Sequence, residues 1–109
     1  MAEVVLKEQT QQWLADPILG QGDIDAKVRR LLEAEYLRKL AQYERANQLL
    51  TQKYGVTFDE FAAQDIIARR NHTWEVEQDA MHWETAIGGI VTVQRRLREI
   101  RSAASAEPS

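Results

Sequence analysis

The segment 53–61, Lys-Tyr-Gly-Val-Thr-Phe-Asp-Glu-Phe, constrains the fold most strongly, because it encodes the end of one helix and the start of the next. Gly55 can adopt the left-handed conformation that closes a helix, since it has no Cβ. Thr57 and Glu60 have the spacing of a capping box, in which each side chain accepts a hydrogen bond from the other residue's amide. Val56 and Phe61 stand where a hydrophobic staple would fix the turn to the new helix. The segment therefore predicts two helices joined by a tight turn.

Long helices are predicted on both sides of this joint. Residues 24–54 contain no proline or glycine, and Asp23 precedes them as a natural cap. A short helix is expected over 58–70, and Thr73 is placed to cap a second long helix over 74–101. That helix begins with acidic residues and ends with arginines, which suits the helix dipole. We therefore expect an all-α fold, a dimeric helical bundle dominated by the antiparallel pair 24–54 and 74–101.

The two ends of the chain give weaker signals. Residues 1–15 fit a helix, which we favour, or a short strand leading into one, and the Asp16-Pro17 pair stops it. Residues 102–109 are small and polar and include a proline, so we expect a flexible tail after a single domain that spans residues 1–101.

Composition excludes several classes of function. The 109 residues include no cysteine, which removes disulfides, thiol nucleophiles and zinc–thiolate sites and fits a reducing compartment. We find neither an apolar stretch long enough to span a bilayer nor an export pattern at the N-terminus, so we expect a cytoplasmic protein without membrane contact. A net charge of −3 gives no general attraction to nucleic acid.

Both predicted long helices carry more apolar surface than one neighbouring helix can cover. In the first, the apolar residues occupy nearly half the circumference, and in the second, Trp74 and Met81 form an additional strip on another side. The main apolar side of the second helix consists of Val76, Ala80, Trp83, Ile87, Ile90, Val91 and Leu97. Because the short third helix covers only part of this surface, we expect a homodimer or a dedicated protein partner.

Gly88-Gly89 breaks the helical pattern of residues 74–101. Each glycine in a helix interior costs about 1 kcal/mol relative to alanine. The pair indicates either a kink, a close approach of another backbone, or a tolerated weak point.

The best candidate for a metal or catalytic site is the set Glu75, Asp79 and His82, which shares one side of the predicted helix. Its carboxylate–histidine step resembles half of a di-metal site in helical bundles, but the second half is not found. An acidic face in water that complements the helix dipole is the explanation that we favour for these residues. A metal-dependent helical enzyme therefore remains an alternative, and we assign no catalytic, metal or cofactor residues.

A DNA-binding alternative rests on the order strand, helix, helix. A strand over 3–6 followed by helices over 8–15 and 24–40 would match small ribbon-helix-helix regulators. The continuous apolar run in the strand and Pro17 in the turn fit that pattern poorly, so DNA binding is not favoured.

Three stretches resemble small helical bacterial antitoxins of toxin–antitoxin pairs: KVRRLLEAEYLRKL at 27–40, QKYGVTFDEF at 52–61 and TWEVEQDAMHWE at 73–84. The block that contains them covers about two thirds of the chain. The resemblance implies an intracellular protein without enzymatic activity or cofactor, which binds and neutralises a protein toxin, often as a homodimer. We therefore expect a non-enzymatic, antitoxin-like protein-binding module.

The residues that we expect at the partner interface are aromatic, methionine or glycine residues of the two long helices. They are Tyr36, Tyr43, Trp74, Met81, Trp83, Gly88 and Gly89.

Overall fold

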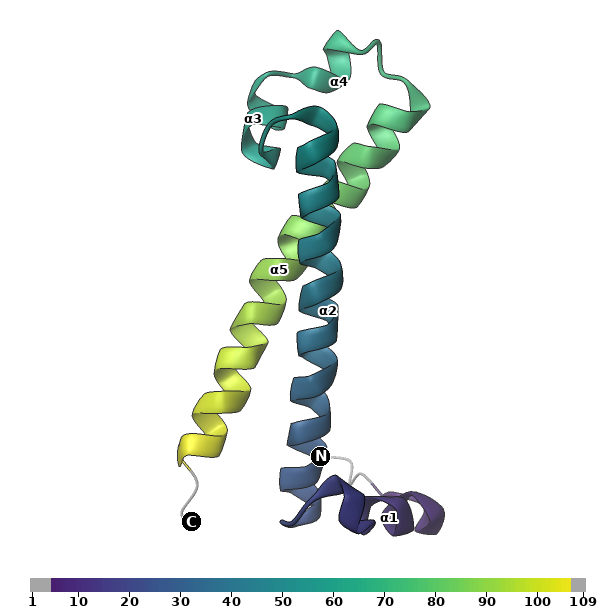
Figure 1. Cartoon of the computed structure of the whole chain (residues 1–109), viewed down its shortest axis with the longest axis vertical. Helices are drawn as coiled ribbons and strands as arrows, with labels where there is room; N and C mark the ends of the chain where they lie inside the picture. The colour runs from purple at the N-terminus through teal and green to yellow at the C-terminus, as the bar shows by residue number, and fades with distance from the viewer. Residues whose placement is uncertain (1–4, 107–109) are drawn as a thin grey trace.

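The computed structural model describes residues 5–106 as helices joined by short connections, with no strand in that range (Figure 1). The elements are α1 (Glu8–Leu14), the 3₁₀ turn η1 (Pro17–Leu19), α2 (Ile24–Tyr54), α3 (Phe58–Ala63), α4 (Ile66–Arg69) and α5 (Trp74–Ala106). The all-α class and the two long helices predicted from the sequence are confirmed. Over the described residues, no helix has both the length and the apolar character needed to cross a bilayer.

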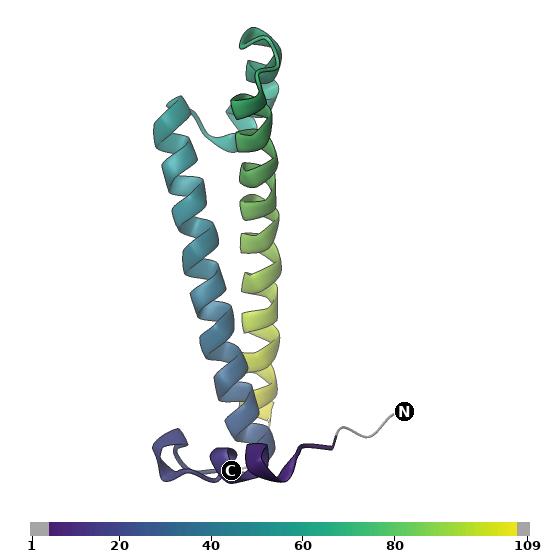
Figure 2. The same ribbon diagram turned by 90° about the vertical axis from the view of Figure 1, so that its right-hand side faces the viewer.

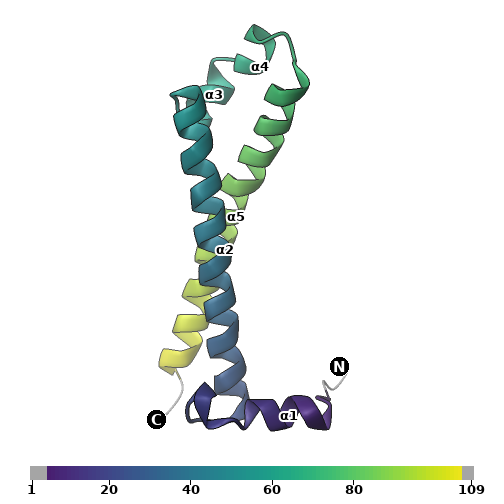
Figure 3. The ribbon, with the colours of Figure 1, turned by 45° about the vertical axis from the view of Figure 1, so that its right-hand side comes forward.

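Helices α2 and α5 run antiparallel and set the length of the molecule. The end of α2 meets the start of α5 through Lys53 and Glu75, and the start of α2 meets the end of α5 through Glu33 and Arg101. The two helices cross in Figures 1 and 3, and Figure 2 shows them side by side in the perpendicular view. The Cα radius of gyration is 19.9 Å, whereas a compact domain of this length has a radius of about 13 Å. The single chain is therefore an elongated hairpin.

The joint between α2 and α3 has the local chemistry that the sequence predicts. Gly55 closes α2 in the left-handed conformation, with φ of 69°. The Glu60 amide donates to the Thr57 hydroxyl, and the Thr57 amide donates to the Glu60 carboxylate, each at 3.2 Å. Val56 packs against the hydrophobic cluster that includes Phe61. The turn between α2 and α3 is therefore held mainly by contacts between residues that are close in sequence.

Replacing Thr57 with alanine tests the capping box. We expect the free energy of unfolding to fall by about 1 kcal/mol, because the Glu60 amide loses its acceptor. Urea unfolding followed by circular dichroism measures this loss. Thr57→Ser keeps the hydroxyl and is the matched control, and an equal loss in both variants would contradict the role of the hydroxyl.

The short third helix predicted over 58–70 is wrong as a continuous element. The chain leaves α3 after Ala63, and Asp65 adopts a left-handed conformation with φ of 52° before α4 begins. Aspartate tolerates this conformation better than most residues. The left-handed residue changes the direction of the chain between α3 and α4, and Ile66 and Ile67 at the start of α4 both pack on the core.

The core lies at the end of the hairpin where α3 and α4 connect α2 to α5 (Figure 1). Its buried centre is Leu50, Phe61, Val76 and Trp83. Trp83 is completely buried, stacks on Tyr54 with ring centroids 5.9 Å apart, and donates its indole N–H to Asn47 at 2.8 Å. Further along the hairpin, α5 buries Ala86, Val93 and Leu97. One side of α5 thus supplies most of the buried residues.

The ends of the chain differ in part from the expectation. Residues 102–106 continue α5, so the predicted flexible tail is wrong for this part, because the alanines there favour helix and no breaker occurs before Pro108. At the other end, α1 is a helix, as we favoured, and it lies across the foot of the hairpin (Figure 2). Val5 and Leu6, the described part of the alternative strand over 3–6, do not form a strand. Residues 3–4 lie outside the described residues.

Candidate functional site

Large apolar side chains remain in water on several helices of the hairpin. They come from α1 and the following turn, from the sides of α2 away from α5, and from the outer side of α5. The exposed residues are Val5, Trp13, Ile18, Ile24, Leu31, Leu32, Leu37, Leu49, Trp74, Met81 and Val91. The accessible surface totals 8468 Å², whereas a compact monomer of this mass exposes about 6,200 Å². The shape of the hairpin therefore leaves much apolar surface uncovered.

On α5, the two apolar sides predicted from the sequence have opposite environments. Trp83 lies in the core with no exposed surface, while Trp74 and Met81 are 74% and 70% exposed. The second strip that the sequence indicates is therefore on the surface of the single chain. It is the outer side of α5, facing away from α2.

The two adjacent glycines of α5 also differ. A Cβ on Gly89 would lie 2.5 Å from the Tyr43 ring, so this glycine lets the α2 tyrosine pack directly on the α5 backbone. The group that approaches Gly89 is thus a side chain and not the backbone that the glycine pair predicts. A Cβ on Gly88 would meet nothing within 4 Å. Packing within the chain explains Gly89 and leaves Gly88 without a role.

The predicted interface residues therefore separate into two groups. Trp83, Tyr43 and Gly89 are engaged inside the hairpin, and Tyr36 is half-buried. Trp83 is a core residue and offers no surface to a partner, because its ring completes the aromatic cluster. Trp74, Met81 and Gly88 remain on the surface.

The acidic residues considered for metal binding meet a cation of the chain itself. The Lys53 ammonium contacts Glu75 at 2.5 Å and Asp79 at 2.7 Å, and the Tyr54 hydroxyl donates to Asp79 at 2.6 Å. His82 is exposed on the same helix. Among the described residues, no group of three or more histidine, cysteine, aspartate or glutamate side chains is arranged to hold a metal ion. The arrangement works as a clamp between the end of α2 and the start of α5.

This clamp shifts the pKa of Asp79, of Tyr54 and of Lys53. Burial tends to raise the pKa of Asp79, but hydrogen bonds from Lys53 and Tyr54 outweigh that effect and lower the pKa below its ordinary value. Burial and the hydrogen bond to Asp79 raise the pKa of Tyr54 to about 12. Hydrogen bonds to Asp79 and Glu75 raise the pKa of Lys53. At neutral pH all three groups are in the protonation state that holds the clamp closed.

Replacing Asp79 with asparagine tests the clamp through pH. At pH 7 we expect a loss of about 1–2 kcal/mol in the free energy of unfolding, because the charge-assisted hydrogen bonds are weakened. Since the folded state lowers the pKa of Asp79, its contribution is present above the ordinary value of 3.8 and is lost as the pH falls through the folded value. The difference between the variant and the unmodified chain should therefore shrink below about pH 4.

Urea unfolding at neutral and acid pH measures this dependence. Glu44→Gln, which neutralises an exposed carboxylate on α2, is the matched control and should leave stability unchanged at both pH values. An Asp79→Asn loss that is the same at both would contradict the clamp.

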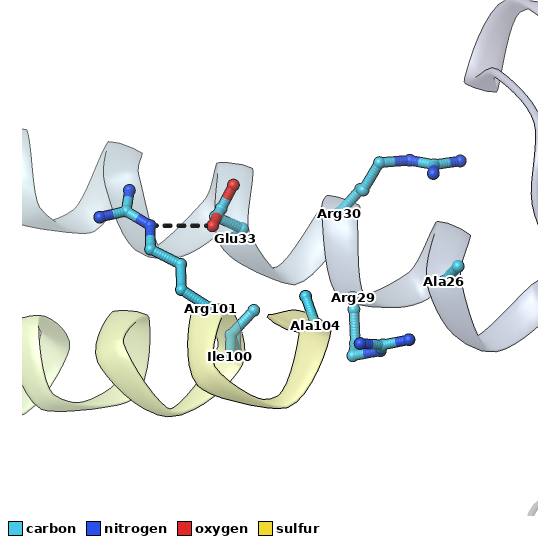
Figure 4. A pocket seen from close by; sticks show the side chains of 7 residues that line it. All are labelled: Ala26, Arg29, Arg30, Glu33, Ile100, Arg101 and Ala104. Atoms are coloured by element: carbon cyan, nitrogen blue, oxygen red, sulfur yellow. Dashed lines mark hydrogen bonds and ion pairs between the residues drawn. The ribbon is translucent and has the colours of Figure 1, made fainter. Parts of the chain in front are cut away.

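A shallow groove of about 440 Å³ lies between the start of α2 and the end of α5, lined by Ala26, Arg29, Arg30, Glu33, Ile100, Arg101 and Ala104 (Figure 4). Its arginines take part in contacts within the chain. Arg29 pairs with Asp25 at 2.9 Å, and Arg101 pairs with Glu33 at 3.1 Å. Arg30 donates to the carbonyl oxygens of Leu19 and Gln21. Arg101 thus joins the end of α5 to the first half of α2, Arg30 holds the turn before α2, and Arg29 pairs within α2.

Comparison of the chain with known protein families, with curated proteins and with solved structures finds no match. The exposed apolar side chains of the hairpin are therefore the features of the chain that bear on its function.

Proposed function

We propose that this chain is a non-enzymatic, antitoxin-like protein of the cytoplasm that binds and neutralises a protein partner through the exposed apolar sides of its helices. The observation that carries the proposal is the uncovered apolar surface of the elongated hairpin. Contiguous apolar surface beyond what a monomer of this size normally shows is typical of interaction sites. The resemblance to antitoxins supplies the class of partner, a toxin.

The outer side of α2 is the surface that we assign to this partner. Ile24, Leu31 and Leu49 lie on one side of the helix, since Leu31 and Leu49 are separated by a whole number of turns. That side points away from Tyr43 and Tyr54, which face α5. Leu31 is 48% exposed and Leu49 is 55% exposed. Ile24 and Leu31 are seven residues apart, the spacing of anchors that enter a hydrophobic groove on another protein. Leu49 lies on the same side further along α2, beyond Arg38 and Arg45.

Co-expression with the product of the neighbouring gene, as the candidate toxin, tests the proposal. We expect the partner alone to arrest growth, the chain to relieve the arrest, and the two proteins to purify as one complex. Leu31→Asp combined with Leu49→Asp should abolish both relief and complex, because a charge would be buried at each anchor. Gln48→Asp adds the same charge on another side of α2 and is the control.

Circular dichroism of the unmodified chain, the double leucine variant and the Gln48→Asp control shows whether each remains helical. Relief of growth arrest that survives both leucine replacements in a folded variant would contradict the assignment to this side of α2. The absence of any complex with the candidate toxin would contradict the antitoxin-like function.

A further inference from the structure

We propose that the outer side of α5 binds a second copy of this chain, with the two α5 helices antiparallel. The surface consists of residues spaced alternately four and three apart, the period with which helices pair along a seam. We call this surface the α5 seam: Trp74, Gln78, Met81, Thr85, Gly88 and Thr92. All six residues are exposed in the single chain.

The α5 seam has the composition of a contact surface between helices. It carries no charge from Trp74 to Thr92, and it presents large side chains at its start and small ones at its middle and end. The same spacing then reaches Arg95 and Glu99, so the uncharged contact between two copies is centred on Met81, Thr85, Gly88 and Thr92. Gly88 costs about 1 kcal/mol in a helix interior, and nothing within 4 Å of its position explains that cost inside the chain. A second helix crossing at Gly88 provides the explanation, because glycine allows close approach.

The charged residues beside the α5 seam indicate that the partner is a second copy of this chain and that the two α5 helices are antiparallel. Along both borders, the first half of α5 is acidic, with Glu75 and Glu77, and the second half is basic, with Arg96 and Arg98. In an antiparallel pair each border meets the same border of the other copy. With Thr85 of one copy opposite Gly88 of the other, Glu77 lies opposite Arg98 on one border. On the other border Glu75, which also holds Lys53, lies opposite Arg96, which also pairs with Glu99 of its own chain. A parallel pair would instead place acidic halves side by side.

A surface that is complementary to itself in this way is what a two-fold symmetric dimer requires. Each contact then occurs twice, so both charge pairs are doubled. The dimer covers Met81 and Gly88 of each copy and leaves the outer side of α2 for a different protein. The inference is therefore independent of the toxin-binding proposal, and its test uses the purified chain alone.

A charge-reversal cycle measured by sedimentation equilibrium tests the pairing. Glu77→Arg or Arg98→Glu alone should raise the dissociation constant of the dimer about tenfold, because two attractive pairs become two repulsive ones. The double variant Glu77→Arg/Arg98→Glu should restore the constant to within about threefold. Along one helix these two positions are about 30 Å apart, so the rescue cannot arise within a single chain.

If the double variant keeps the raised dissociation constant of the single variants, the antiparallel pairing is overturned. A chain that stays monomeric at about 100 µM, where even a weak dimer would form, would overturn the dimer itself.

Gly88→Lys separates association from folding. Lysine favours helix and has free space at this position, so the fold should be retained, but two lysines at the crossing should convert the dimer to the 12.6 kDa monomer. Gln94→Lys adds the same charge on another side of α5 and should remain dimeric. A helical Gly88→Lys variant that dimerises as tightly as the unmodified chain would show that another surface makes the contact.

Discussion

Replacing Trp83 with alanine should lower the free energy of unfolding by about 3–5 kcal/mol, the largest effect of any single change considered. The side chain is completely buried between α2, α3 and α5, and its loss leaves a cavity among Tyr54, Phe58 and Phe61. It also removes the shorter of the two hydrogen bonds that Asn47 Oδ1 accepts, and leaves the one from the Thr51 hydroxyl at 3.5 Å. Since small domains are stable by only about 5–15 kcal/mol, this single change should remove a large part of the total stability.

Trp74→Ala is the matched control, because it removes the same side chain from the same helix. Trp74 is 74% exposed, so its loss should change stability by no more than about 0.5 kcal/mol in dilute solution, where the chain is monomeric. Urea unfolding followed by circular dichroism measures both variants. Equal losses for Trp83→Ala and Trp74→Ala would contradict the core as described.

Adding one methyl group at each of the adjacent glycines should have opposite effects. Gly88→Ala should raise the free energy of unfolding by about 1 kcal/mol, because alanine favours helix and the position is open. Gly89→Ala gains the same propensity but places the methyl 2.5 Å from the Tyr43 ring. Overpacking of this kind costs about 1–3 kcal/mol, and the tyrosine must leave its place or the helices must separate.

A double-mutant cycle identifies the tyrosine as the cause. In a Tyr43→Ala background, Gly89→Ala should become stabilising, because the space that the ring occupied is then open. Thermal unfolding of the four proteins at one low concentration gives the coupling energy. A Gly89→Ala variant that is destabilised equally with and without the Tyr43 ring would contradict the direct contact.

Local chemistry explains which parts of the fold could be predicted. The joint at Gly55 and Thr57 and the uninterrupted helix from Ile24 to Tyr54 depend on neighbouring residues, and both are found as predicted. The break between α3 and α4 depends on how Ile66 and Ile67 reach a core formed by distant residues. No local residue pattern carries that information, so residues 58–70 were predicted as one helix.

The candidate site was predictable to a similar extent. Periodicity separates Trp83 from Trp74 and Met81 as two sides of one helix, but only the packing of α2 shows which side is covered. The clamp of Lys53 with Glu75 and Asp79 was missed. An antiparallel arrangement of the two long helices brings the end of the first beside the start of the second, so a basic residue and two acidic residues at those ends were the available signal.

The mass of the purified chain in solution tests most directly the claim that this hairpin acts by association. Sedimentation from about 1 to about 100 µM covers the range of ordinary protein dimers. We predict that a dimer with twice the mass of 12.6 kDa accumulates over this range. A folded, helical monomer throughout would show that the exposed sides of α2 and α5 are stable in water, and it would contradict the account.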